Sequence, residues 1–175
     1  MKNEKGLVHV YTGNGKGKTT AALGVALRSW GHGKRVCIIQ FMKNCPESGE
    51  FKALKKIGKN FRIMQFGRGC FIKDKPTDLD KKLAMEGLEF VKKILVEDKN
   101  DLVILDELNC ALYCGLLKKN PVESTLAAKP IRTDLVITGR YAPKWLTDKA
   151  DLVTEMREKK HCYKRGVKAK QGLEF

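Results

Sequence analysis

The sequence lacks any apolar run that approaches the roughly 20 residues needed to cross a bilayer as a helix. Its first residues lead directly into a short apolar segment, without the hydrophobic stretch and cleavage site of a secretory signal. The pattern therefore predicts a cytoplasmic protein with no membrane partner.

Cysteine motifs for metal binding are also missing. The six cysteines include no C-x-x-C pair, and the three histidines are scattered along the chain. Cys110 and Cys114 have the spacing of one helix face, but no second pair accompanies them. Small buried thiols are therefore favoured over a structural zinc site, and a disulfide framework is not expected.

Acidic residues are scarce relative to basic ones. The 175 residues include 35 Lys and Arg against 20 Asp and Glu, which gives a formal net charge of +15. This excess invites a polyanionic partner, but a solvated basic surface explains it as simply, so the charge alone does not decide. The basic residues are spread along the chain without interleaved aromatic pairs, so nucleic acid is not expected, whereas a small phosphorylated ligand would exploit the same field.

Apolar segments alternate with helical patterns over a length that suits one ordinary domain, residues 1–175. Strands are predicted at 7–11, 35–41, 61–66, 102–105, 134–138 and 151–155. Helices are predicted at 20–30, 47–58 and 108–117, with two more starting after Thr77 and at Pro121, and the last twenty residues show no strong period. This alternation predicts a single α/β domain with a mostly parallel sheet and helices on both faces.

A glycine-rich segment lies between the first predicted strand and the first predicted helix. Its Gly17-Lys18-Thr19 end fits a phosphate-binding loop, although Thr12 stands where the motif has its first glycine. Glycines let successive amides turn toward phosphate oxygens, and the helix N-terminus adds its own free amides. The predicted nucleotide-binding residues are Gly13, Asn14, Gly15, Lys16, Gly17, Lys18, Thr19 and Thr20.

An acidic pair, Asp106-Glu107, ends the fourth predicted strand, where P-loop proteins place carboxylates that hold Mg²⁺. With the hydroxyl of Thr19, this pair forms the predicted metal site, and Mg²⁺ with a nucleoside triphosphate is the implied ligand. The pattern leaves open which of the two carboxylates faces the metal. It also leaves open the fate of the nucleotide.

Residues 12–22 closely resemble the phosphate loop of the ATP:corrinoid adenosyltransferases. The likeness continues in order through residues 31–34, 40–43, 105–108, 136–140, 150–157 and 166–175. The resemblance implies a RecA-like P-loop fold and a cob(I)yrinic acid a,c-diamide adenosyltransferase. Such an enzyme transfers the 5′-deoxyadenosyl group of ATP to the cobalt of a Co(I) corrinoid, cobalamin or cobyrinic acid a,c-diamide, and releases triphosphate in cobalamin biosynthesis and salvage.

The resemblance also implies residue roles and partners. Lys16 and Lys18 are expected as catalytic groups that stabilise the departing triphosphate, with ATP as co-substrate and Mg²⁺ as cofactor. Corrinoid contacts are expected from Lys43, Arg140 and the loop after the third strand, Cys70, Phe71 and Ile72. Enterobacterial members carry a Phe-x-Trp pair in that loop, which here has no Trp, so Phe71, or Cys70 and Ile72, would supply the apolar contact. A homodimer and a flavoprotein-type reductase are the implied partners.

Two other functions remain open at this point. The chain fits a P-loop NTPase that acts with nucleic acid, or a nucleotide-binding regulatory module without turnover. The NTPase would need basic-aromatic stripes and a polar group that senses the γ-phosphate, and neither is visible in the sequence.

Overall fold

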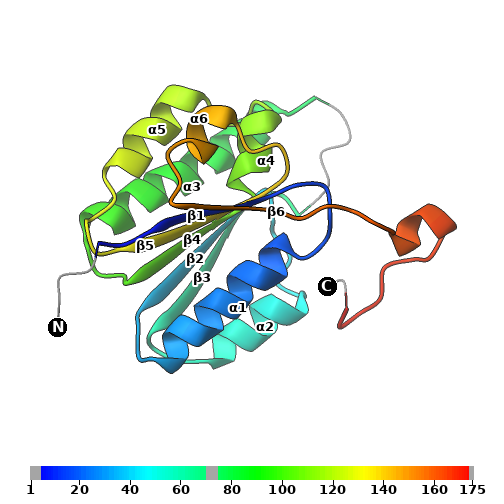
Figure 1. The fold of residues 1–175 in the computed structure, drawn as a ribbon, viewed down its shortest axis with the longest axis horizontal. Coiled ribbons are helices and arrows are strands. Elements are labelled where there is room, and N and C mark those ends of the chain that lie inside the picture. Colours follow the sequence, from blue (N-terminus) through cyan, green and yellow to red (C-terminus); the bar gives the residue numbers. More distant parts are fainter. Residues whose placement is uncertain (1–4, 70–74, 174–175) are drawn as a thin grey trace.

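The computed structural model describes residues 5–69 and 75–173. Within them, six strands form one sheet in the order β3-β2-β4-β5-β1-β6, with all neighbours parallel (Figure 1). The strands are β1 (Val8–Thr12), β2 (Val36–Phe41), β3 (Phe61–Phe66), β4 (Leu102–Asp106), β5 (Asp134–Thr138) and β6 (Leu152–Glu155). The helices are α1 (Lys18–Gly31), α2 (Gly49–Lys56), α3 (Asp78–Val96), α4 (Leu108–Tyr113), α5 (Lys119–Ala127), α6 (Lys144–Thr147) and the 3₁₀ helix η1 (Cys162–Arg165).

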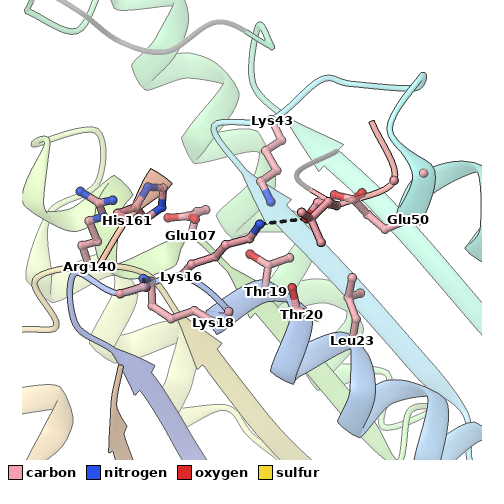
Figure 2. A pocket seen from close by; sticks show the side chains of 15 residues that line it. Lys16, Lys18, Thr19, Thr20, Leu23, Lys43, Glu50, Glu107, Arg140 and His161 are labelled. Carbon is pink, nitrogen blue, oxygen red and sulfur yellow. Dashed lines mark hydrogen bonds between the residues drawn. The ribbon is translucent and has the colours of Figure 1, made fainter. Parts of the chain in front are cut away.

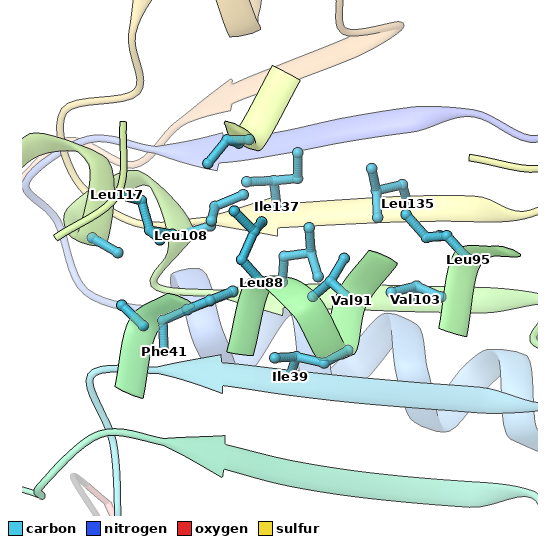
Figure 3. Packing of buried hydrophobic residues seen from close by; sticks show 14 of the residues in the cluster. Ile39, Phe41, Leu88, Val91, Leu95, Val103, Leu108, Leu117, Leu135 and Ile137 are labelled. Atoms are coloured by element: carbon cyan, nitrogen blue, oxygen red, sulfur yellow. The ribbon is translucent and has the colours of Figure 1, made fainter. Parts of the chain in front are cut away.

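Helices cover both faces of the sheet, which confirms the predicted fold class. Figure 1 shows α1 and α2 on one face and α3, α4, α5 and α6 on the other. Alternate residues of each strand point to opposite faces. Ile39 and Val103 accordingly pack under α3 (Figure 3), whereas Ile38 and Ile104 pack with the α1 side. The described part of the chain contains no helix with the length and apolar character of a membrane span.

The element boundaries differ from the predicted ones where glycine and proline act locally. The helix expected to reach 117 ends at Tyr113, because Gly115 adopts a left-handed φ of 69°. The helix expected to begin at Pro121 begins at Lys119, since proline is accepted within a first turn, where amides have no intrahelical partner. The short elements α6 and η1 were not predicted.

The alternation of the strands also sets the polar end of the sheet. Gln40, Asp106 and Thr138 come at even-numbered positions near the carboxyl ends of β2, β4 and β5, on the α1 face. Gln40 is the register partner of Asp106 on β4 and of Gln65 on β3. The strand order places β5 between β4 and β1, so Thr138 lies between Asp106 and the phosphate loop. Gln40, Gln65, Asp106 and Thr138 are joined by hydrogen bonds at this end of the sheet.

Candidate active site

A cavity of about 490 Å³ opens at the carboxyl edge of the sheet, beside the start of α1 (Figure 2). The phosphate loop forms one wall, and segments distant in the sequence form the others. Its lining residues are Gly15, Lys16, Gly17, Lys18, Thr19, Thr20, Leu23, Lys43, Gly49, Glu50, Glu107, Arg140, His161, Gly172 and Leu173. Six of the eight predicted nucleotide-binding residues therefore line one cavity; Gly13 is partly exposed and does not line it, and Asn14 borders a separate polar recess.

The phosphate loop packs backbone against backbone on the segment that follows β6. The Gly15 amide donates to the Met156 carbonyl at 2.6 Å. Gly13 has a left-handed φ of 95°, and a Cβ there would lie 2.4 Å from the same Met156 oxygen. Thr12, at the motif's first glycine position, accepts a hydrogen bond from the Ala142 amide through its hydroxyl at 3.2 Å. The variant loop thus keeps its two close approaches at glycine and anchors its start with a hydroxyl.

Two loop lysines donate to carbonyl oxygens around the cavity. The Lys18 ammonium lies 2.8 Å from the Gly13 carbonyl and 2.7 Å from the Gly15 carbonyl. Burial lowers the pKa of Lys18 from its ordinary value. The Lys16 ammonium reaches across the cavity to the Leu173 carbonyl at 2.9 Å, the dashed line in Figure 2. Both cations are thus held at the cavity wall by neutral acceptors.

Asp106 is buried and accepts four hydrogen bonds. Its Oδ1 accepts from the hydroxyls of Thr19 at 2.8 Å and Thr138 at 2.7 Å. Its Oδ2 accepts from the Gln40 amide at 2.9 Å and the Lys43 ammonium at 2.8 Å. Burial raises the pKa of Asp106, but the Lys43 charge and these hydrogen bonds outweigh it and lower the pKa below its ordinary value. Asp106 is therefore a carboxylate at neutral pH.

Glu107 follows with a left-handed backbone, φ 62°, and lines the cavity. Its amide donates to the Thr138 hydroxyl at 3.0 Å, which fixes the turn between β4 and α4. The structure thus brings the predicted metal residues close together. Asp106 is hydrogen-bonded to Thr19, and Glu107 lines the cavity beside it. Carboxylate and hydroxyl oxygens are the ligands that Mg²⁺ prefers, so this set fits the ion.

Of the five residues predicted to contact the corrinoid, two line the cavity and three lie outside the described part of the chain. Lys43 and Arg140 line the cavity, from the ends of β2 and β5 respectively. Cys70, Phe71 and Ile72 lie outside the described residues. The roles of all five in binding a corrinoid stay predictions.

Some site residues were missed by sequence reasoning. Gln40 could have been found from the sequence, because it is the polar residue in an otherwise apolar strand. Its side-chain oxygen accepts a hydrogen bond from the Gln65 side-chain amide at 2.8 Å. The tail residues His161, Gly172 and Leu173 line the cavity although the tail has no periodic pattern. Outside the lining residues, Tyr113 and Tyr141 form an exposed stacked pair with centroids 4.1 Å apart, next in sequence to Arg140, and no local motif indicates that contact.

The comparison with known proteins identifies the family. Residues 4–175 match the family described as "ATP:corrinoid adenosyltransferase BtuR/CobO/CobP". The chain belongs to this family. It is 37% identical over 174 residues to the corrinoid adenosyltransferase CobA of Salmonella typhimurium, covering 99% of this chain and 88% of the relative. It is 34% identical over 174 residues to the corrinoid adenosyltransferase of Pseudomonas aeruginosa, covering 99% and 86% of the two chains.

A third relative, the corrinoid adenosyltransferase of a Sinorhizobium species, is 37% identical over 175 residues, with 99% of this chain and 82% of the relative covered. Membership of the ATP:corrinoid adenosyltransferase family makes this chain a transferase that adenosylates corrinoids, with ATP as co-substrate. The family agrees with the resemblance seen in the sequence. It decides against the nucleic-acid NTPase and the regulatory module as the main function.

Proposed function

We propose that ATP lies along the phosphate loop in the 490 Å³ cavity, with its ribose 5′ carbon open to the corrinoid. The reduced cobalt of the Co(I) substrate attacks this carbon with an electron pair. The carbon–oxygen bond to the triphosphate breaks, and its electron pair leaves with the triphosphate. Cobalt is oxidised from Co(I) to Co(III) as the cobalt–carbon bond forms, so no protein base is required. The observation that carries this proposal is the phosphate loop joined to Asp106 through Thr19.

The two loop lysines are proposed to stabilise the departing triphosphate. Lys16 and Lys18 already donate to backbone carbonyls, and phosphate oxygens are stronger acceptors of the same kind. Charge on the triphosphate grows as the carbon–oxygen bond breaks, so cations placed beforehand favour the transition state over the bound substrate. The following helix α1 adds amides and the positive end of its dipole.

The proposed cofactor is Mg²⁺, held by the Thr19 hydroxyl and by the Asp106 and Glu107 carboxylates. When bound, the ion neutralises phosphate charge. Asp106 is kept ionised by its hydrogen bonds and by Lys43, which suits it to bind a cation or a water on that cation. Glu107 reaches the same cavity from the neighbouring residue.

Corrinoid binding is proposed for Lys43 and Arg140, and for Cys70, Phe71 and Ile72. Corrinoid side chains end in amide or carboxylate groups, and the two cations offer donors to these groups beside the nucleotide. The apolar residues of the loop after β3 would cover the lower face of the ring. A reductase that supplies Co(I) and a cytoplasmic location, where ATP is available, complete the proposal.

A homodimer is also proposed. Its support is the edge strand β6, where Leu152 and Val153 point to opposite faces and are 40% and 45% exposed. Sedimentation of the purified chain measures this directly, and a monomer at micromolar concentration would contradict it.

The deciding experiment is an anaerobic incubation with ATP, Mg²⁺ and a chemically reduced corrinoid. The expected products are a light-sensitive adenosylated corrinoid and inorganic triphosphate in equal amounts. Formation of ADP and orthophosphate without adenosylated corrinoid would contradict the proposed reaction. Parallel assays with cobalamin and cobyrinic acid a,c-diamide establish the preferred substrate.

A further inference from the structure

The carboxylate of Asp106 has all its acceptor positions in use. An ionised carboxylate offers about four lone-pair sites, and Asp106 accepts two hydrogen bonds on each oxygen. A divalent cation, or a water bound to one, also needs a lone pair of this group. One of the four donors therefore has to leave when a cation binds through Asp106.

Three of the four hydrogen-bond donors to Asp106 either cannot move or can stay in place when a cation binds. Gln40 is fully buried, and its carbonyl accepts from the Gln65 amide, so moving it would leave buried polar groups unpaired. Thr138 is fully buried and also accepts from the Glu107 amide. Thr19 is at the cavity, but its hydroxyl can donate to Asp106 while its lone pairs face a cation.

Lys43 is the donor that is able to move. Its side chain is 26% exposed and lines the cavity, while the Asp106 side chain is 1% exposed. An ammonium group on a flexible four-carbon stem can turn with little strain. Its positive charge would also repel a cation at the same oxygen, so the two do not share Oδ2 favourably.

We propose that Lys43 and the divalent cation alternate at Oδ2 of Asp106. In the free protein Lys43 compensates the buried carboxylate, which would otherwise be an unpaired charge. When the cation binds with ATP, Lys43 releases Oδ2 and turns its ammonium to the phosphate chain in the same cavity. Lys43 is then a positioning residue for the cation site, and its ammonium contacts phosphate in place of the corrinoid contact proposed for it above. This role rests on the proposed Mg²⁺–ATP site.

The proposed alternation predicts that a mutation of Lys43 raises the affinity for metal. Removing a residue from a metal site ordinarily weakens metal binding, whereas removing a competitor strengthens it. Binding of Mn²⁺ alone to the full chain without nucleotide, measured by electron paramagnetic resonance, tests this. K43M is expected to bind Mn²⁺ about three- to tenfold more tightly than the parent.

The matched control is K52M, which removes an exposed lysine of α2 that pairs with Glu47. It is expected to change Mn²⁺ affinity by less than twofold, because an exposed charge is well screened. Equal or weaker Mn²⁺ binding by K43M than by the parent would overturn the alternation. If K43M does not fold, K43R decides instead, because a guanidinium keeps a competing positive charge at Oδ2 and is expected to bind Mn²⁺ no more tightly than the parent; tighter binding by K43R would overturn the proposal.

The second half of the proposal concerns ATP. At saturating Mg²⁺, K43M is expected to bind ATP about three- to tenfold more weakly, since a phosphate contact is lost. If K43M binds ATP as tightly as the parent, the proposed movement of the Lys43 ammonium toward the phosphates is wrong. Neither the Mn²⁺ measurement nor the ATP measurement includes a corrinoid. If both give the expected results but the protein does not adenosylate a corrinoid, the proposed reaction is wrong and the inference about Lys43 still holds.

Discussion

The amide nitrogen of Gly15 lies 2.6 Å from the carbonyl oxygen of Met156, and this contact sets how close the phosphate loop lies to the strand edge. A Cβ at position 15 would lie 2.7 Å from that oxygen, closer than backbone atoms allow. The amides that face the cavity are therefore positioned by a segment 141 residues later in the chain.

Gly15→Ala is expected to push the loop away from Met156, weaken ATP binding about tenfold or more and lower the free energy of unfolding by about 1–3 kcal/mol. Calorimetric ATP titration and urea unfolding measure both effects. Gly24→Ala is the matched control, because a Cβ at this exposed position of α1 meets nothing within 4 Å. It is expected to stabilise the protein by about 0.5–1 kcal/mol and leave activity unchanged; the same ATP defect in both variants would contradict the steric argument.

Lys18→Ala and Thr19→Ala are each expected to reduce adenosylation at least ten- to a hundredfold, since charge-assisted contacts to phosphate contribute about 1.5–3 kcal/mol each. The assay is initial rate with pre-reduced corrinoid. Lys55→Ala, at an exposed lysine of α2 beside Phe51, is the control and should retain the parental rate. Near-parental rates in both loop variants would remove the phosphate-loop assignment.

Asp106→Asn and Glu107→Gln should separate structure from cation binding. The NH₂ group of an asparagine at position 106 would face the Gln40 amide and the Lys43 ammonium, which are also hydrogen-bond donors. Asp106→Asn is therefore expected to lower the free energy of unfolding by about 1–3 kcal/mol. Glu107→Gln should leave stability near that of the parent and raise the Mg²⁺ concentration required for half-maximal rate. Equal Mg²⁺ requirements in the parent and both variants would take the acidic pair out of the metal site.

The ion pair between Arg68 and Asp80 predicts an acid-dependent stability. The Arg68 guanidinium donates to both Asp80 oxygens at 2.7 and 2.9 Å, and Thr77 adds its amide and hydroxyl. These contacts lower the pKa of Asp80 to about 2. Because the folded pKa lies below the unfolded value of about 3.9, the stabilisation is complete above that value and is lost as the pH falls through about 2.

Asp80→Asn is therefore expected to cost about 1–2 kcal/mol at pH 7, less than the full linkage because Arg68 is 43% exposed. The cost should shrink as the pH falls from 4 to 2. Urea unfolding at pH 7, 4 and 2.5 follows it, with Asp78→Asn as the control at a fully exposed carboxyl. A cost that is constant over this range would show that the pair's charge is not its source.

Much of the fold could be predicted because its signals are local. A buried parallel strand such as β2 is apolar throughout except at Gln40, and Thr77 caps α3 with a side-chain contact to the Asp80 amide, as its residue type predicted. The phosphate loop is likewise a contiguous motif. α6 was missed because its four residues do not span two helical turns.

The parts of the site that could not be predicted depend on contacts between distant segments. The corrinoid contact expected of Lys43 stays a prediction, but the hydrogen bond of its ammonium to Asp106, 63 residues away in sequence, was not foreseen. Thr138 holds Asp106 only because the strand order brings β5 beside β4, and no pattern within β5 encodes that neighbour. The stacking of Tyr113 on Tyr141 depends on the left-handed φ of 60° at Tyr141, an unusual conformation for a residue other than glycine.

The contact between Lys16 and the Leu173 carbonyl has a practical consequence for work with this protein. Residues 166–173 contribute no strand to the sheet, yet Gly172 and Leu173 form part of the cavity wall. Proteolytic loss of residues 166–173 is therefore expected to alter the cavity and the ATP binding proposed for it, while circular dichroism still shows the sheet and helices intact. Mass spectrometry of the intact chain before each assay guards against this error.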